Sequence, residues 1–385
     1  MAIPPIPSRD GIPAAFFDRL LVTSSVFWLF STVQKLQSMR KPRLDRDAPI
    51  AVTLFSGGGG IETGLVAAGI RPVVSVDCDP TDKGFSRQIQ FCRDRNFEQY
   101  GTQSYLATVQ EVAEKDFVGI PRQPFILHAS PVCSSFSKLS LLNGKRESEE
   151  DINAAIVTAK AIEVLRPQWF TLENAVGYRQ SESYEIIVTA LNRCSYYFDC
   201  QEIDMVNFGV PQNRSRLIVV AGLGKLSSII PSTTSIKGWG NCLEGLILTQ
   251  PELLLQQQEK AILLANLAGH FNTAIVQRVG VCKRGKDKAS LRRGSEPCWA
   301  ITKAMFRDSK GSSRGGITYW DNLSKKAYKL PMRAVARIGG FPDWYDLPDR
   351  EAIAGSIIGL SVPPLFASQL FSHLLSITGK YLINS

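Results

Sequence analysis

Hydrophobic positions from residue 50 onward form short β-rich runs that alternate with stretches of helical periodicity. The β-rich runs predict strands over residues 50–55, 72–77, 125–130, 168–174, 196–205 and 215–221. The helical stretches cover residues 61–69, 151–165 and 183–191. Strands separated by helices are typical of βαβ units, so we expect an α/β fold with a mostly parallel sheet and helices on both faces. Ligands of such sheets bind at the carboxyl ends of the strands.

The alternation ends after Gly222. Residues 223–330 contain one clear helical run, over 251–269, followed by a Gly- and Ser-rich region. From Pro331 the sequence is again typical of a globular core and ends in an apolar helix over 365–375. We therefore expect four parts, namely an N-terminal extension (1–48), a large α/β domain (49–222), a smaller lobe (223–330) and a return to the first domain (331–385).

The N-terminal extension contains an apolar stretch, residues 20–34, that is too short to span a bilayer. Charges of mixed sign precede it, which does not fit a signal peptide. The extension is either an amphipathic helix or a segment that precedes a natural start at Met39. The chain has 8 cysteines without a CxxC pair and 3 histidines, which excludes a disulfide scaffold and a structural zinc site. We expect a cytoplasmic protein with no metal and no membrane segment.

Basic residues are concentrated in one window of the sequence, residues 281–340. The formal net charge is +9, but residues 281–340 alone hold fifteen Lys and Arg against four Asp and Glu, so the rest of the chain is slightly acidic. Aromatic residues are interleaved with these cations, at Trp299, Phe306, Tyr319, Trp320 and Tyr328. Basic residues with interleaved aromatics are typical of surfaces that bind a phosphate backbone. The alternative is a solvated basic loop.

Candidate chemistry lies at the predicted carboxyl edge of the sheet. In TLFSGGGGIETG, a strand that ends at Phe55 runs into the glycines 57–60 and then a helix. Consecutive glycines allow a tight turn and a close approach of the backbone to a ligand. Asp77 and Asp79 follow the next strand, where a carboxylate can accept hydrogen bonds from ribose hydroxyls. The pattern favours a nucleoside-binding site over a purely structural turn.

Three further blocks follow strands or precede one. HASPVCSSFS places Cys133 on a loop after a strand, and a thiolate is the best side-chain nucleophile near neutral pH. TLENAVGY places Glu173 at the end of another apolar strand, where an apolar pocket would raise its pKa. FGVPQNRSRLIVVA places Arg214 and Arg216 before a strand, and alternate positions of a strand point the same way. We expect these two guanidinium groups to converge on one site.

Together these four blocks resemble those of the cytosine-5 DNA methyltransferase family. RAVARIGGFPDW (333–344) and IIGLSVPP (357–364) are similar to two further blocks of that family. The resemblance covers about residues 50–222 and 297–370, and it implies a Rossmann-like methyltransferase fold that uses S-adenosyl-L-methionine. It also implies that 223–330 is a target-recognition lobe, and that the partner is double-stranded DNA from which the cytosine is flipped out. We expect a monomer associated with the nucleoid, and a cognate restriction endonuclease stays open as a partner.

The resemblance assigns catalytic roles to four residues. Cys133 would attack C6 of cytosine and so activate C5 for methylation. Glu173 would hydrogen-bond or protonate N3, where charge develops, and Arg216, with Arg214 beside it, would hold the O2 edge.

Other residues would hold the cofactor. By resemblance they are Phe55, Gly57, Gly59, Asp77, Gln110 and Pro131. Phe55 and the two glycines would contact the adenosyl and methionine parts, and Asp77 would accept from the ribose hydroxyls. Gln110 stands about where the family has an acidic residue near the adenine amine.

Several positions depart from the family pattern. Thr53 stands where an Asp is usual, which removes a carboxylate from the cofactor turn; Val132 replaces a Pro, and Leu360 replaces an Asn. Two alternatives therefore stay open, a tRNA cytosine-5 methyltransferase on the same scaffold and a catalytically weak DNA-binding paralogue. The recognition sequence cannot be read from these residues.

Overall fold

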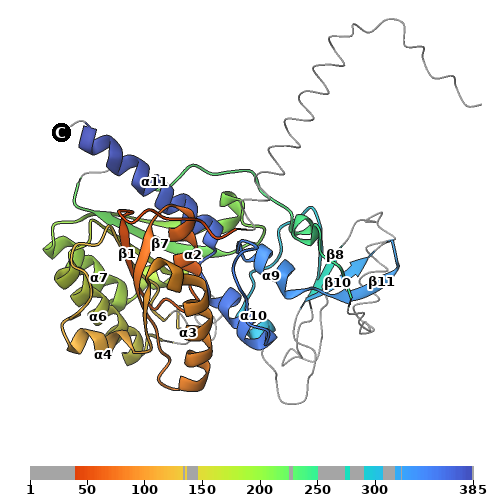
Figure 1. Ribbon diagram of the computed structural model, residues 1–385, viewed down its shortest axis with the longest axis horizontal. Coiled ribbons are helices and arrows are strands. Elements are labelled where there is room, and N and C mark those ends of the chain that lie inside the picture. Colours follow the sequence, from red (N-terminus) through yellow and green to blue (C-terminus); the bar gives the residue numbers. More distant parts are fainter. Residues whose placement is uncertain are drawn as a thin grey trace, which may run out of the picture. The chain divides into compact units, whose positions relative to one another are not determined.

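The unit that runs from Arg43 to Ser385 contains a seven-stranded sheet with helices on both faces (Figure 1). Its order is β3-β2-β1-β4-β5-β7-β6. The strands are β1 (Ile50–Leu54), β2 (Arg71–Val76), β3 (Gln103–Tyr105), β4 (Ile126–Ala129), β5 (Trp169–Asn174), β6 (Tyr197–Asp204) and β7 (Ser215–Gly222). The computed structural model describes residues 40–132, 135–136, 146–224, 229–249, 274–277, 290–306, 317–321 and 323–383.

All six predicted strands are confirmed, and so is the mostly parallel sheet. Strand β7 is the exception, because it runs antiparallel to both β5 and β6. The connection from β6 to β7 holds only the short helix η3 (Met205–Phe208) and a turn, which is too little for a parallel crossover. As a result, the start of β7 lies at the same edge as the carboxyl end of β5, where Asn174 pairs with Leu217.

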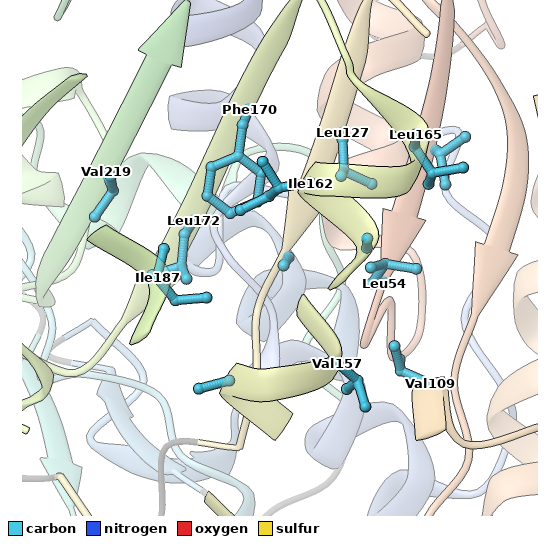
Figure 2. Close-up of a cluster of buried hydrophobic side chains, with 14 of the residues drawn as sticks. Leu54, Val109, Leu127, Val157, Ile162, Leu165, Phe170, Leu172, Ile187 and Val219 are labelled. Carbon is cyan, nitrogen blue, oxygen red and sulfur yellow. The ribbon is translucent and has the colours of Figure 1, made fainter. Parts of the chain in front are cut away.

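Helices cover both faces of this sheet. One face packs against α4 (Val109–Glu114), α6 (Glu149–Leu165) and α7 (Glu182–Arg193), and the buried side chains between them are shown in Figure 2. The other face packs against α2 (Gly60–Ala67) and α11 (Pro364–Ile383). Along β7, Val219 faces the first core and Val220 the second, so a strand without polar alternation is buried on both sides.

The predicted helices over 61–69, 151–165 and 183–191 correspond to α2, α6 and α7. Helix α6 begins at a capping box, in which Ser148 accepts from the Asp151 N–H and Asp151 accepts from the Ser148 N–H. Helix α3 (Lys83–Phe97) was not predicted, because its composition is mostly polar. It nevertheless buries Ile89, Cys92 and Phe97.

A second, antiparallel sheet has the order β11-β10-β8-β9. Its strands are β8 (Ala274–Gln277), β9 (Ser290–Arg293), β10 (Ile317–Asp321) and β11 (Lys326–Lys329). The short helices η4 (Trp239–Leu243) and η5 (Lys303–Met305) belong to the same stretch of chain. The helical run predicted over 251–269 and the predicted N-terminal helix lie outside the described residues.

The chain then returns to the large sheet through α9 (Met332–Ile338), α10 (Glu351–Leu360) and α11. Helix α11 packs against α2, and side chains such as Phe366 and Phe371 belong to the same core as β1. Among the described residues, the stretch Glu351–Thr378 is long and apolar enough to cross a membrane, yet 72% of its most apolar window is buried inside the protein. It has the burial of a core segment.

Candidate active site

The glycine turn between β1 and α2 has an unusual backbone. Phe55, Gly57 and Gly59 have φ angles of 57°, 53° and 89°, all in the left-handed region. Glycine adopts this region freely, whereas Phe55 does so at a cost that its surroundings must offset. The turn is held on the sheet by the Ser56 N–H, which donates to the Val76 carbonyl at 3.1 Å.

Packing around this turn differs from one glycine to the next. A Cβ atom at Gly58 would lie 2.4 Å from Ile357 of α10, and one at Gly60 would lie 2.6 Å from Ser361. A Cβ atom at Gly57 would meet no atom within 4 Å. The turn is therefore packed tightly against the C-terminal helices on one side, and the backbone at Gly57 is open to a ligand on the other.

Asp77 lies at this turn, directly after β2. Its carboxylate accepts a hydrogen bond from the Gly57 N–H. Burial raises the pKa of Asp77, and the guanidinium of Arg93 opposes that effect. Asp79 instead binds Thr81 through its exposed carboxylate, and this hydrogen bond lowers the pKa of Asp79. Of the two predicted acids, Asp77 is the one beside the turn.

Gln110 lies in the first turn of α4, which follows the neighbouring strand β3 at the same edge of the sheet. Its side chain is exposed and donates from Nε2 to Glu114 Oε1 at 3.2 Å, along the helix. Gln110 stays a prediction as a residue that contacts adenine.

The loop after β4 carries the predicted nucleophile. Cys133 itself lies outside the described residues. The Pro131 carbonyl accepts from Asn174 Nδ2 at 3.2 Å, which joins this loop to the end of β5. On the far side of Cys133, Ser135 donates to Asp151 Oδ2 at 2.6 Å. The loop is thus anchored to β5 and to α6 on either side of the predicted nucleophile.

Glu173 and Arg216 form an ion pair at the ends of the adjacent strands β5 and β7. The distance from Arg216 Nε to Glu173 Oε1 is 2.8 Å, and the side chains are 20% and 9% exposed, respectively. The expectation that Glu173 lies in an apolar pocket was therefore wrong, since a charged partner lies against it. The pair is held at the carboxyl edge because β7 runs opposite to β5.

Arg214 does not join this pair. Its guanidinium is buried and donates from Nη1 to the carbonyls of Ile301 at 3.1 Å and Gly359 at 3.2 Å. The expected convergence with Arg216 fails because Arg214 lies before the strand, which begins at Ser215, so the alternation of a strand does not apply to it. Arg214 joins the start of β7 to the segment before η5 and to α10.

Sequence reasoning assigned no site to several buried polar residues. Gln212 accepts from the Ile301 N–H at 2.8 Å and donates to the Ile338 carbonyl at 3.2 Å. His128 of β4 lies between Thr171 and Ser130, with both ring nitrogens 2.8 Å from a hydroxyl, and burial lowers its pKa to about 3. A polar residue inside an apolar strand was the only signal for His128.

The basic window is only partly a free surface. Arg337 forms an ion pair with Asp343, and Lys329 pairs with a carboxylate of α10. Phe306 and Tyr319 are buried in a core that η4 and β10 share with α9 and α10, so these two aromatics are not available to a nucleic acid. Seven of the fifteen cations lie outside the described residues. Within the described ranges, no three His, Cys, Asp or Glu side chains gather in a way that could hold a metal ion.

Comparison with known proteins identifies the family. The profile of the C-5 cytosine-specific DNA methylase family matches residues 51–376. A Type II methyltransferase M.AplI of Arthrospira platensis is 26% identical over 328 residues, which cover 83% of this chain and 84% of that protein. The chain belongs to the C-5 cytosine-specific DNA methylase family, a class of methyltransferases.

Solved structures agree on the fold. A putative DNA modification methyltransferase from an Escherichia coli prophage superposes with a TM-score of 0.60 at 16% identity, covering 86% of this chain and 100% of that one. The Dnmt2 methyltransferase of S. pombe superposes with a TM-score of 0.54 at 16% identity, covering 86% of this chain and 99% of that one. The Rossmann-like methyltransferase fold expected from the sequence is confirmed.

Proposed function

We propose that this protein transfers a methyl group from S-adenosyl-L-methionine to C5 of a cytosine in double-stranded DNA, with Cys133 as the nucleophile. The Glu173–Arg216 ion pair is the observation that carries the proposal. It lies at the same edge of the sheet as the glycine turn, Asp77 and the loop that leads to Cys133. Family membership supports the chemistry that this edge would perform.

The residues at the turn fit the cofactor. The open space over Gly57 would admit its methionine part, and Asp77 would accept from its ribose hydroxyls. Phe55 and Pro131 would complete this surface, with Gln110 toward the adenine, whereas Gly59 is buried against Phe97 and would shape the turn through its backbone. When bound, the cofactor supplies an electrophilic methyl group.

The ion pair would act on the base. Attack of the Cys133 thiolate on C6 of the flipped cytosine moves electrons toward N3, where Glu173 would hold a proton. Arg216 would then bind the O2 edge, so each member of the pair would exchange its partner for an atom of the base. Once C5 carries the methyl group, water would accept the C5 proton and Cys133 would be eliminated from C6, which would release the methylated cytosine. Arg214 supports this edge from behind rather than touching the base.

The parts of the chain would divide these tasks. Residues 49–222 with 331–385 would carry the cofactor and the reaction, and residues 223–330 would recognise the target sequence. Exposed cations of that lobe would bind the DNA backbone, in a monomer that works at the nucleoid in the cytoplasm. A partner endonuclease belongs to the same proposal, since the relatives are named Type II methyltransferases.

Replacing the nucleophile tests this proposal. Cys133→Ala should abolish transfer of labelled methyl groups to DNA, while calorimetry still shows S-adenosylhomocysteine binding. Cys200→Ala, at a half-buried cysteine of β6, is the matched control and should keep full activity. Full activity of Cys133→Ala would disprove the mechanism, and a preference for tRNA in competition with duplex DNA would change the substrate. Bisulfite sequencing of DNA from an expressing host would give the target sequence.

A further inference from the structure

Two fully buried charged residues lie beneath the glycine turn, and the proposed mechanism does not use them. Arg93 of α3 and Glu62 of α2 are both 0% exposed. Arg93 Nη2 and Glu62 Oε2 are buried without a hydrogen-bond partner in the described part of the chain. Ionised groups out of water are costly unless other charges compensate them, so their retention requires a cause.

Arg93 holds the turn at Gly57. Its Nη1 donates to the Gly57 carbonyl at 2.8 Å and to Ser56 Oγ at 3.0 Å, and its Nε donates to Ser104 Oγ at 3.3 Å. Asp77 accepts from the N–H of the same Gly57. The peptide groups on both sides of Gly57 are therefore fixed by charged side chains, at the one glycine of the turn that is open to a ligand.

Glu62 is held by two hydroxyl groups. Thr53 Oγ1 and Ser75 Oγ donate to Glu62 Oε1 at 2.5 and 2.7 Å. The carboxylate that Thr53 lacks is thus supplied by α2. Arg93 acts electrostatically on both Glu62 and Asp77, so one guanidinium compensates two carboxyl groups. Burial raises the pKa of each of these carboxyls.

We propose that Arg93 is a positioning residue of the cofactor site, which acts through Gly57 and Asp77 without touching the cofactor. Glu62 competes with Asp77 for the positive charge of Arg93. The inference rests on the proposed function, because Asp77 matters as the group that accepts from the ribose. Asp77 accepts from both ribose hydroxyls most strongly when it is ionised, because a carboxylate is a stronger acceptor than a protonated carboxyl group. Arg93 stabilises the ionised form of Asp77 inside the protein, and the nearby carboxyl group of Glu62 weakens that stabilisation.

The other groups near Asp77 do not replace Arg93. Asp79, on the same loop, is exposed, and its pKa is lowered by Thr81, so it stays negative. Lys303 acts on Asp79, whereas Arg93 is the cation that acts on Asp77. Tyr345, whose hydroxyl donates to the Gly58 carbonyl, has its pKa raised well above the usual value by burial and stays neutral.

The pH dependence of ribose binding tests the proposal. The probe is 5′-methylthioadenosine, which keeps the adenosine part of the cofactor and has no amino-acid charges. In the wild-type protein, affinity measured by calorimetry should rise with pH as Asp77 ionises. Arg93→Met should move the midpoint of that rise upward by about one pH unit or more, since an adjacent opposite charge shifts a carboxyl pKa by about that much. Glu62→Gln should move it downward.

Controls separate this role from a structural one. Arg87→Met, at an exposed position of the same helix, should leave the midpoint unchanged. Circular dichroism and Tm verify that each variant folds. If Arg93→Met does not fold, the downward shift of the binding midpoint in Glu62→Gln tests the proposal by itself. Midpoints that stay at the wild-type value in the folded variants would overturn the inference. Failure of the wild-type protein to bind S-adenosylhomocysteine would instead overturn the proposed function.

Discussion

The two halves of the carboxyl edge are built differently. Around β1 and β2, the cofactor half presents backbone groups of the glycine turn, and the charged side chains that hold it are fully buried behind. Around β5 and β7, the reaction half presents the side chains of Glu173, which is buried, and Arg216, which is partly exposed, and the two bind each other. The backbone of the cofactor half is held by the side chains packed behind it, whereas the two side chains of the reaction half hold each other.

This difference follows from what each half must do. Backbone groups cannot rotate toward a ligand, so a backbone site works only if packing sets its shape in advance. Side chains can exchange partners, so an ion pair holds both groups in place until a base arrives. The comparison predicts that variants of the reaction half change rates, and that variants of the cofactor half change stability or cofactor affinity.

The largest expected effect comes from the reaction half. Glu173→Gln keeps the shape of the side chain but removes the acid that would hold a proton at N3, and should lower kcat by about 100-fold to 10,000-fold. S-adenosylhomocysteine affinity should stay at the wild-type value, because Glu173 lies away from the glycine turn. Steady-state kinetics with duplex DNA and calorimetry on the same preparation measure both. A variant that loses cofactor affinity in proportion to kcat would break the division between the halves.

In the cofactor half, two glycines should respond in opposite ways. A Cβ atom at Gly64 would lie 2.4 Å from the Ala367 Cβ, so Gly64→Ala should destabilise the protein by about 1–3 kcal/mol through overpacking. Gly57→Ala meets no atom within 4 Å and costs only about 1–2 kcal/mol of backbone strain at its positive φ, but should weaken cofactor binding. Urea unfolding and calorimetry distinguish them. Equal losses of affinity in both variants would contradict the open approach to Gly57.

The smallest effect at neutral pH is expected at His128, behind the reaction half. Its pKa is lowered from 6.5 to about 3 in the folded protein, so the unfolded chain binds the proton first as pH falls. The stability that neutral His128 contributes is full above pH 6.5 and is lost as the pH falls toward 3. In this window His128→Gln should reduce the slope of unfolding free energy by up to about 1.4 kcal/mol per pH unit. Parallel slopes in urea unfolding would contradict the burial of a neutral ring.

The large sheet could be predicted because its strands are short apolar runs between glycines and helices. The reversal of β7 was not predicted, because the pattern of a strand buried on both faces is the same in either direction. That reversal also determines where the two arginines lie, since it places Arg216 against Glu173 and leaves Arg214 before the strand. Hydrophobic periodicity does not define the first residue of a strand to within one or two positions.

The charged residues under the turn were missed for a different reason. Arg93 lies in a helix of mostly polar composition, where charged residues are normally exposed. Glu62 lies in the helix that follows the glycines, and the sequence pattern did not show which segment packs against that helix. Their burial depends on α10, α11 and the segment around Tyr345, which lie far along the chain. Contacts between distant segments leave no local signal.

The packing of the glycine turn on the C-terminal helices has a consequence for synthesis. Gly58, Gly60 and Gly64 contact Ile357, Ser361 and Ala367, which leave the ribosome much later. At roughly 5–20 residues per second, the intervening stretch of roughly 300 residues takes on the order of 15–60 s to translate. Throughout that interval the turn lacks the surface against which it packs. A nascent chain with its first strands complete would therefore be unable to hold the cofactor until α11 has docked on α2.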